Sequence, residues 1–282
     1  MFILDGKAAS AKLRERLKDE IEVLLHKAGR PPGLAVILVG EDPASAIYVR
    51  NKEKNCKETG IISKAYKLPA DISQVELEEL IMRLNSDDEI DGILLQLPLP
   101  RHLNSQKCLE LIKPAKDVDG FHPENVGKLT LGLPGFRSCT PAGIMALIQE
   151  YQQDVSGKDC VVVGRSNIVG KPLALMLLSQ NATVTICHSR TADLKSHVQK
   201  ADFIFAAVGI PAFITGDMVK PGAVVVDVGI NRTDDGLVGD CDFQGIQHKA
   251  AAMTPVPGGV GPMTIALLLK NTVSSWKSRK KL

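Results

Sequence analysis

The 282-residue chain lacks the features that mark several specialised classes of protein. It has no uncharged apolar run of 18 residues, so we expect no membrane-spanning helix and no membrane partner. Its first ten residues, "MFILDGKAAS", lack the basic start and the long apolar core of a signal peptide. Together these absences predict a cytoplasmic protein.

A strong net charge is also missing. The formal net charge is +2, which is too small to predict nucleic-acid binding, although it would not repel an anionic substrate. The basic cluster "WKSRKKL" at the C-terminus is typical of a solvated tail. We therefore expect a small-molecule substrate and no nucleic-acid partner.

The six cysteines lack the spacing of a metal site or of a redox pair. No two of them form C-x-x-C, and no histidines cluster at metal-ligand spacing. Several lie in apolar runs, where cysteine behaves as a small hydrophobic residue. This pattern predicts a reduced, cytosolic protein without a metal.

Helical and strand patterns, in contrast, alternate along most of the chain. Repeated β–α alternation predicts a parallel sheet covered by helices. In the first part we expect helices at 7–27, 43–59 and 73–85, the last opened by a Ser73–Glu76 capping box, and strands at 34–40, 61–68 and 92–99. In the second part we expect strands at 160–164, 182–188, 203–209 and 223–231, with helices at 140–151, 191–201 and 265–276 and a further helix that begins at Gly170.

A polar stretch at 113–141 interrupts this rhythm and predicts a crossing between domains. The fold class is therefore α/β, with two α/β domains and a ligand in a cleft between them. We place the first, catalytic domain at 1–121 and a Rossmann-like parallel-sheet domain for NAD(P) at 139–262. The C-terminal helix, 263–282, is expected to pack back on the first domain.

The segment "VVVGRSNIVGKP", residues 161–172, resembles a dinucleotide-binding turn without its middle glycine. Gly164 and Gly170 can fill the roles of the first and last glycines of the Rossmann fingerprint. Arg165 and Ser166 occupy the middle, where a guanidinium and a hydroxyl are good partners for phosphate. A glycine-rich turn of an unrelated α/β protein is the alternative.

The next strand, 182–188, is not followed by the acidic residue that receives the ribose hydroxyls in NAD-specific folds. His188, Ser189 and Arg190 stand there instead. A carboxylate would repel a 2′-phosphate, whereas serine and arginine accept one. The sequence thus favours NADP over NAD, with ordinary surface residues as the alternative.

Tyr48 and Lys52 lie four residues apart on a predicted helix, so both project from one face, and Ser45 lies one turn earlier. A lysine beside a phenol can donate a proton or, if desolvation lowers its pKa, accept one. The alternative is that both belong to the amphipathic rim of a surface helix.

Three further polar residues stand out in the first domain. Gln96 lies in the predicted buried strand 92–99, where an amide needs a partner: a functional lysine, a polar ligand or a neighbouring loop. Asp117 and Asp119 lie in the irregular crossing, where a carboxylate can bind the amidine-like edge of a heterocycle. Formation of an Asx turn is the competing interpretation, and it suits Asp117 better than Asp119.

Taken in order, eight motifs resemble the bifunctional methylenetetrahydrofolate dehydrogenase/methenyltetrahydrofolate cyclohydrolase family over nearly the whole chain. Among them "DGILLQLPLP" and "PGGVGPMT" are highly specific to that family. The set is "YVRNK", "DGILLQLPLP", "KDVDGFHPENVGKL", "CTPAGI", "VVVGRSNIVGKP", "ATVTICHSRT", "GAVVVDVGIN" and "TPVPGGVGPMT".

The resemblance implies two coupled activities in one-carbon folate interconversion. An NADP-dependent dehydrogenase oxidises 5,10-methylenetetrahydrofolate to the 5,10-methenyl cation, and a cyclohydrolase opens that cation to 10-formyltetrahydrofolate. It also implies a homodimer and no metal. The alternatives are a folate dehydrogenase without the hydrolase activity, another two-domain dehydrogenase such as a shikimate dehydrogenase relative, and a non-catalytic nucleotide-sensing module.

The resemblance further implies roles for the residues of the first domain. Lys52 is essential to the cyclohydrolase step, and Gln96 holds and tunes it. Tyr48 stacks on or positions the folate, Asp119 anchors the pterin, and Ser45 is a weaker member of the same wall.

For the second domain, the resemblance implies that Gly164, Arg165 and Ser166 contact the pyrophosphate and phosphate groups. Ser189 and Arg190 are expected at the 2′-phosphate, and Ile230 against the bound dinucleotide. The glycine-rich loop before the last helix is expected beside nicotinamide and folate; Gly259 and Pro262 belong to it.

Overall fold

The computed structural model describes residues 1–234 and 236–282, and the side chains of residues 43–47 lie outside the description. The chain divides into two compact units. We call residues 12–139 with 265–282 the three-stranded unit, and residues 1–11 with 140–264 the six-stranded unit, after their sheets. The expected first domain, 1–121, thus differs at residues 1–11, because Phe2–Ile3 pairs with Ala252–Met253 in the six-stranded sheet.

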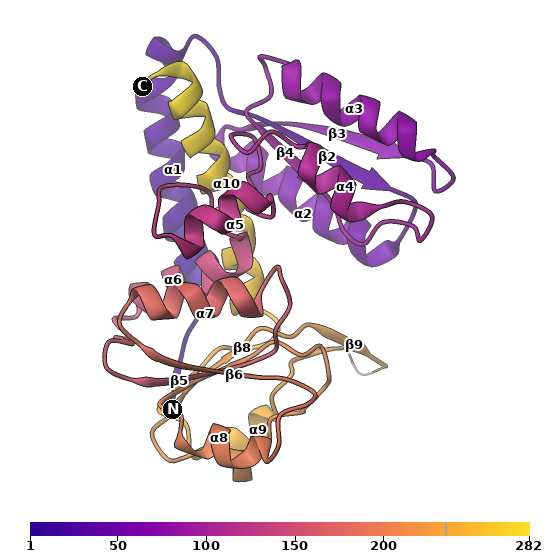
Figure 1. The fold of residues 1–282 in the computed structure, drawn as a ribbon. Coiled ribbons are helices and arrows are strands. Elements are labelled where there is room, and N and C mark those ends of the chain that lie inside the picture. Colours follow the sequence, from indigo (N-terminus) through magenta and orange to yellow (C-terminus); the bar gives the residue numbers. More distant parts are fainter. Residues whose placement is uncertain (235) are drawn as a thin grey trace. The chain divides into compact units, whose positions relative to one another are not determined.

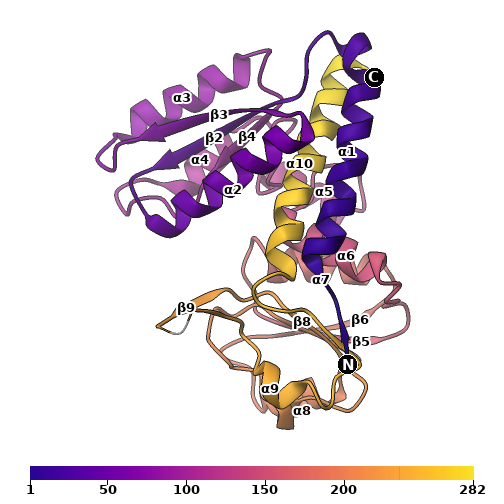
Figure 2. The same cartoon turned by 180° about the vertical axis from the view of Figure 1, so that it is seen from behind.

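The three-stranded sheet is parallel and has the order β3-β2-β4. Its strands are β2 (Gly33–Val39), β3 (Ile62–Leu68) and β4 (Gly92–Leu95). Helices α3 (Gln74–Ser86) and α4 (Ser105–Leu111) supply the leucines and isoleucines that pack on one face of β2 and β4. Helix α2 (Pro43–Thr59) lies on the opposite side of the strands from α3 (Figures 1 and 2). The capping box predicted at Ser73–Glu76 is confirmed at the start of α3.

A buried carboxylate ties the ends of the three-stranded unit together. Asp91, which is fully buried, accepts hydrogen bonds from Arg30 at 2.6 and 2.9 Å and from Arg279 at 2.8 Å. Arg30 follows α1 (Gly6–Ala28), and Arg279 lies in the last turn of α10 (Val260–Lys280). Lys277 of α10 also forms an ion pair with Glu20 of α1. The C-terminal part of α10 is therefore held to this unit by charge as well as by packing.

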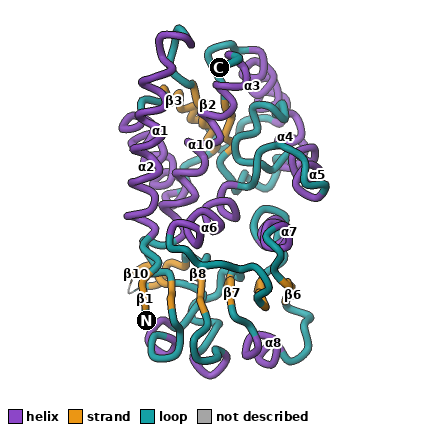
Figure 3. The backbone as a smooth tube through the Cα atoms, turned by 90° about the vertical axis from the view of Figure 1, so that its left-hand side faces the viewer, coloured by secondary structure: helices purple, strands orange, loops and turns teal. Residues whose placement is uncertain are grey.

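The six-stranded sheet is also parallel, with the order β1-β11-β8-β7-β5-β6. Figure 3 shows β1, β8, β7 and β6 following one another in this sequence across the sheet. Its strands are β1 (Phe2–Ile3), β5 (Asp159–Val163), β6 (Thr183–Cys187), β7 (Phe203–Ala206), β8 (Val224–Asp227) and β11 (Ala252–Met253). The chain leaves β5 for β6 on one side and returns to β7 on the other. In open α/β sheets, ligands bind at such a reversal, beside the carboxyl ends of the strands.

Helices cover both faces of the six-stranded sheet. Helix α7 (Gly170–Ser179) lies on one side, and α8 (Leu194–Lys200) and α9 (Phe243–Ile246) lie on the other (Figures 1 and 2). Helix α6 (Cys139–Glu150) leads into β5, and a short 3-10 turn spans Gly216–Met218. Strands β9 (Asn231–Thr233) and β10 (Gly236–Val238) form a separate antiparallel pair. The α/β fold with a Rossmann-like parallel sheet is confirmed.

Several local predictions were wrong, among them the strand expected at 203–209, which ends at Ala206. The crossing at 113–141 contains a helix, α5 (Pro123–Thr130), which His122 caps and which is too short for a clear periodicity. The strands predicted at 92–99 and 223–231 end at Leu95 and Asp227, so Gln96 follows its strand instead of lying within it. The last helix begins at Val260, which places Pro262 in its first turn.

The helices of the described part are each too short or too polar to cross a bilayer.

Candidate active site

Lys52 and Gln96 are brought together at the carboxyl end of the three-stranded sheet. Lys52 projects from α2, and Gln96 is the first residue after β4. The Lys52 Nζ donates a hydrogen bond of 3.0 Å to Gln96 Oε1, while Gln96 Nε2 donates to the carbonyl of Leu97 at 2.8 Å. Two of the three partners that the sequence suggested for Gln96, a lysine and a neighbouring loop, are therefore present. The lysine is held by a neutral acceptor.

The charge state of Lys52 is set by its surroundings. Desolvation lowers the pKa of Lys52, and the nearby carboxylate of Asp119 opposes this effect without cancelling it. Desolvation also raises the pKa of Asp119 to about 6, against the attraction of Lys52. Both shifts favour the neutral form of the group, because a site poor in water disfavours charge. Lys52 is thus closer to giving up its proton than an exposed lysine.

The backbone beside β4 explains why Asp119 lies near Lys52. The Ile93 amide donates to the carbonyl of Lys116 at 2.8 Å, so residues 116–118 extend the sheet next to β4. From α10, the Asn271 Nδ2 donates to the carbonyl of Val118 at 2.8 Å. The segment that carries Asp119 is therefore fixed by a strand on one side and by a helix on the other.

Asp117 has the structural role that the sequence suggested for it. It is buried, and it accepts hydrogen bonds from the amides of Phe121 and His122 at 3.1 and 2.8 Å. Asn125 Nδ2 donates to it at 2.8 Å. These hydrogen bonds hold the turn that leads into α5, whereas the side chain of Asp119 is half-buried and lies near Lys52.

Cys139 is the residue of this cluster that sequence reasoning missed. Its thiol is buried and donates to the carbonyl of Val118 at 3.2 Å, and its amide donates to the carbonyl of Asp119 at 3.3 Å. Burial and the Asp119 charge raise its pKa well above the usual range, so it stays a neutral thiol. The motif "CTPAGI" contains this cysteine, but its spacing in the sequence indicates only a hydrophobic residue and no contact with Lys52 or Asp119.

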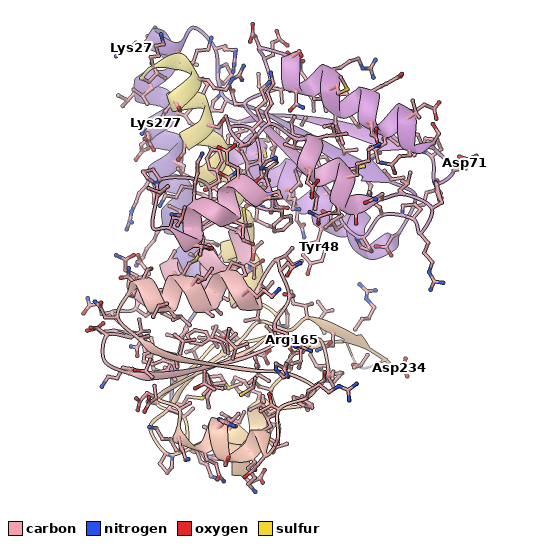
Figure 4. The ribbon with its side chains drawn as sticks, in the orientation of Figure 1. Lys27, Tyr48, Asp71, Arg165, Asp234 and Lys277 are labelled. Atoms are coloured by element: carbon pink, nitrogen blue, oxygen red, sulfur yellow. The ribbon has the colours of Figure 1, made fainter. Side chains whose placement is uncertain are left out.

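Tyr48 projects from α2 one turn before Lys52 (Figure 4). Its ring is half-buried, and desolvation raises the pKa of the phenol. The phenol therefore remains protonated near neutral pH and can donate a hydrogen bond. The side chain of Ser45, predicted on the same face, lies outside the described residues.

The turn after β5 has the close backbone packing of a dinucleotide-binding turn. Gly164 has a φ of +131°, and a Cβ on it would lie 2.2 Å from the carbonyl oxygen of Ala207. A Cβ on Gly170 would lie 2.2 Å from the carbonyl oxygen of Gly164. Neither glycine tolerates a side chain, as the first and last positions of the fingerprint require.

The middle of this turn differs from a glycine fingerprint in the way the sequence indicated. Arg165 is exposed and lies directly after Gly164 (Figure 4). The Ser166 oxygen accepts hydrogen bonds from the amides of Val169 and Gly170 at 3.1 and 3.3 Å. Ser166 thus holds the start of α7 and keeps only its hydroxyl hydrogen for an anion, whereas the Arg165 guanidinium is open to one.

The loop after β6 is held by its own side chains. Thr191 Oγ1 accepts from the His188 amide at 2.8 Å, and His188 Nδ1 accepts from the Arg190 amide at 3.1 Å. Ser189 and Arg190 are exposed. The loop therefore presents a hydroxyl and a guanidinium at the carboxyl end of β6, the strand that pairs with β5, within a unit whose strand order suits a nucleotide.

Ile230, Gly259 and Pro262 lie in or beside the remaining loops of the six-stranded unit. Ile230 is 42% exposed, which is unusual for an isoleucine that follows a buried strand. A Cβ on Gly261 would lie 3.5 Å from Ile230 Cδ1, so the isoleucine lies beside the start of α10. Gly259 is buried, and its carbonyl oxygen would be 1.7 Å from a Cβ on Gly6. Pro262 is half-buried in the first helical turn.

All six cysteines are free and buried. Within the described residues, no three His, Cys, Asp or Glu side chains are grouped so that they could hold a metal ion. The groups available for chemistry are therefore the lysine, amide, carboxyl and phenol of the three-stranded unit, and the turn and cations of the six-stranded unit.

Two family models match almost the whole chain. The model described as "Tetrahydrofolate dehydrogenase/cyclohydrolase, catalytic domain" matches residues 4–119, and the corresponding "NAD(P)-binding domain" matches residues 138–280. A curated relative, the Bifunctional protein FolD of Maridesulfovibrio salexigens, is 67% identical over 281 residues that cover 98% of each chain.

Solved structures agree with these matches. The bifunctional enzyme FolD-methylenetetrahydrofolate dehydrogenase/cyclohydrolase from Campylobacter jejuni superposes with a TM-score of 0.97 at 54% identity, covering 99% of both chains. The Trypanosoma brucei methylenetetrahydrofolate dehydrogenase-cyclohydrolase, solved with NADP cofactor and inhibitor, has a TM-score of 0.94 at 37% identity. The superposition covers 99% of this chain and 98% of the Trypanosoma brucei chain.

Proposed function

The chain belongs to the bifunctional tetrahydrofolate dehydrogenase/cyclohydrolase family, and from that premise we propose that its three-stranded unit binds the folate and its six-stranded unit binds NADP. The enzyme oxidises 5,10-methylenetetrahydrofolate and then hydrolyses the 5,10-methenyl product to 10-formyltetrahydrofolate. We further propose that it works in the cytoplasm as a homodimer, as family likeness implies.

The observation that carries the assignment of the hydrolase site is the hydrogen bond of 3.0 Å between Lys52 and Gln96. Because desolvation lowers the Lys52 pKa, a fraction of the amine is neutral and can take a proton from water. The oxygen of that water forms a bond to the methenyl carbon. The bond from this carbon to N5 then breaks, N5 gains a proton, and the formyl group stays on N10. One proton is released per water consumed.

The neutral amide suits Gln96 for its part in this step. It orients the Lys52 amine without adding a negative charge, which would favour the ammonium form. The methenyl substrate is itself a cation, so its arrival disfavours the ammonium further. A dehydrogenase without hydrolase activity would have no use for this arrangement.

Asp119 and Tyr48 are proposed to bind the folate. With a pKa of about 6, Asp119 is mostly ionised at pH 7 and can accept two hydrogen bonds from the amidine-like edge of a pterin. The half-buried Tyr48 ring offers a surface for stacking, one helical turn from Lys52. Ser45 is proposed to belong to the same wall.

The six-stranded unit fits NADP by the chemistry of its loops. Gly164 and Gly170 allow the close backbone packing of a dinucleotide-binding turn, Arg165 and Ser166 offer donors to a pyrophosphate, and Ser189 with Arg190 suits a 2′-phosphate. We propose that Ile230, Gly259 and Pro262 line the nicotinamide half of the site. When it is bound, NADP accepts the hydride of the methylene carbon.

The test separates the two activities. The purified protein is given methylenetetrahydrofolate with NADP or NAD, and reduced nicotinamide and methenyl absorbance are followed separately. We expect reduction with NADP in preference to NAD, and hydrolysis of added methenyltetrahydrofolate without any dinucleotide. Absence of reduction with either dinucleotide would refute the dehydrogenase assignment.

For the hydrolase, Lys52→Met should lower the rate of methenyl hydrolysis by at least about 100-fold, because proton transfer by a positioned group contributes that much. NADP binding should stay unchanged. Lys54→Met is the matched control, since its side chain is 72% exposed on the same helix and pairs with the exposed Glu58 at 3.8 Å. Normal hydrolysis by Lys52→Met would show that another group moves the proton.

A further inference from the structure

Two buried aspartates of the six-stranded unit have no part in the roles proposed above. Asp227 is the last residue of β8 and is 2% exposed, and Asp240 follows β10 and is fully buried. Buried carboxylates are costly unless hydrogen bonds compensate them. The hydrogen-bond donors that surround these two carboxylates therefore indicate their role.

Asp240 accepts hydrogen bonds from two separate loops. Its Oδ2 accepts from the amides of Val208 and Gly209 at 2.6 and 2.9 Å. Its Oδ1 accepts from the amide of Ile210 at 3.0 Å and from Asn231 Nδ2 at 2.8 Å. The first three donors belong to the loop after β7, and the fourth follows Ile230. A carboxylate offers about four acceptor positions, so all of them are used.

Asp227 holds Asp240 in place. Its Oδ1 accepts from the amides of Asp240 and Gly229 at 2.8 and 3.1 Å, and its Oδ2 accepts from the amide of Cys241 at 2.8 Å. The loop that contains Ile230 is thus fixed at both ends, by Asp227 through Gly229 and by Asp240 through Asn231.

The loop after β7 lies where the chain reverses in the sheet. Strand β7 is the neighbour of β5, and the loop touches the turn of Gly164: a Cβ on that glycine would lie 2.2 Å from the carbonyl oxygen of Ala207. The three amides that Asp240 orders directly follow Ala207. A shift of this loop would therefore displace the turn that is proposed to hold the pyrophosphate.

We propose that Asp240 is a positioning residue of the NADP site, which joins the loop after β7 to the loop of Ile230 and is itself oriented by Asp227. This inference rests on the proposed binding of NADP to the six-stranded unit. Asp240 has no contact with the dinucleotide in this role. It sets the backbone of the two loops between which the dinucleotide lies.

The substitution Asp240→Asn tests the role with a change of one atom. An asparagine has one acceptor oxygen and one NH2 group. In either orientation of the amide, the NH2 group faces two of the four donors, so two hydrogen bonds are lost and two donors are left opposed. The connection between the loops is then weakened, because at most two of the four hydrogen bonds remain, although the volume of the side chain is kept.

The measurement is the dissociation constant for NADP by titration calorimetry, with methenyl hydrolysis without dinucleotide as the second readout. We expect Asp240→Asn to raise the dissociation constant at least about tenfold and to keep hydrolysis within about twofold, because the hydrolase cluster belongs to the other unit. Asp242→Asn is the matched control: it caps the short helix α9 through Gly245 at 3.1 Å and should leave both readouts unchanged.

Unchanged NADP binding by Asp240→Asn would overturn the inference, and failure of the wild type to bind NADP would instead refute the proposed function. If Asp240→Asn does not fold, Asn231→Ala decides, since it removes the hydrogen bond of 2.8 Å by which the loop of Ile230 is held to Asp240. Weaker NADP binding with normal hydrolysis supports the positioning role, and unchanged binding refutes it.

Discussion

At the scale of single residues, the proposed hydrolase site depends on which acceptor faces a desolvated lysine. Gln96 Oε1 accepts from Lys52, whereas the charged acceptor, Asp119, acts on the lysine without a direct hydrogen bond described between them. The outcome is a pKa of Lys52 below its usual value, so the neutral amine is present at lower pH than for an exposed lysine. Desolvation lowers the Lys52 pKa, and the neutral amide of Gln96 does not oppose this effect as a carboxylate would.

Gln96→Glu should reverse that balance. A carboxylate at the same position stabilises the ammonium form and raises the Lys52 pKa, so the neutral fraction at a given pH falls. We expect the rising limb of the pH profile of methenyl hydrolysis to move to higher pH, with a rate at pH 7 lower by on the order of tenfold for each unit by which the pKa rises.

The control for this prediction is Gln106→Glu, which adds the same charge on the exposed surface of α4, where solvent screens it. Its pH profile should match that of the wild type. A Gln96→Glu profile that coincides with it would mean that the ionisation of Lys52 does not limit the rate.

At the scale of secondary-structure elements, the ends of strands and the starts of helices place the functional groups. The turn from β5 to α7 brings the Gly170 backbone against the carbonyl of Gly164, and Ser166 closes it with hydrogen bonds to the amides that start the helix. Helix α10 plays a comparable part in the other unit, where Asn271 fixes the backbone before Asp119.

Gly170→Ala should disturb the turn, because its Cβ would lie 2.2 Å from a backbone oxygen and the turn must open to admit it. We expect weaker NADP binding, by about tenfold or more, and a loss of about 1–3 kcal/mol in the free energy of unfolding of this unit, as overpacking usually costs. Calorimetric titration and thermal unfolding measure the two effects.

Gly127→Ala on α5 is a control of opposite sign. A Cβ on Gly127 meets no atom within 4 Å, so the substitution should stabilise the helix by roughly 0.5–1 kcal/mol and leave NADP binding unchanged. If both alanine variants behave alike, the close approach at Gly170 has no energetic consequence.

At the scale of the whole molecule, residues distant in sequence complete each unit. The first strand, β1, completes the six-stranded sheet beside β11, and the last helix is tied into the three-stranded unit by Arg279 and Asp91. Each unit is therefore built from discontinuous segments, so its stability depends on contacts that close long loops.

Asp91→Asn should destabilise the three-stranded unit strongly. It leaves Arg30 and Arg279 beside a neutral group in a buried place, and breaking a buried ion pair on one side costs about 3–5 kcal/mol. Trp276 is the single tryptophan of the chain and is fully buried in this unit, so its fluorescence in a urea titration reports the loss there.

Asp88→Asn is the comparison variant, because its fully exposed side chain meets Arg279 at 3.2 Å and an exposed pair contributes at most about 1 kcal/mol. Equal urea midpoints for the two variants would show that the buried cluster contributes no more than a surface pair.

The sequence by itself determined the order of elements, the two α/β parts, the family and most of the candidate residues. The reason is that these follow from local periodicity, from caps such as Ser73–Glu76 and from motifs of a few residues whose side chains indicate their chemistry. It misplaced the ends of elements: Gln96 looked like a strand residue because the apolar run continues past Leu95, where pairing with β2 stops.

Only the tertiary structure decided which side chains meet. Lys52 and Gln96, 44 positions apart in the sequence, form a hydrogen bond. The Asp117 carboxylate is hydrogen-bonded within a turn, whereas the Asp119 carboxylate lies near Lys52. Cys139 joins these residues through a backbone contact that no local sequence pattern reveals. The same holds for Asp227 and Asp240, whose partners lie in three separate loops. Spacing along a chain records which face a residue occupies, but the contact between two faces depends on how strands and helices pack.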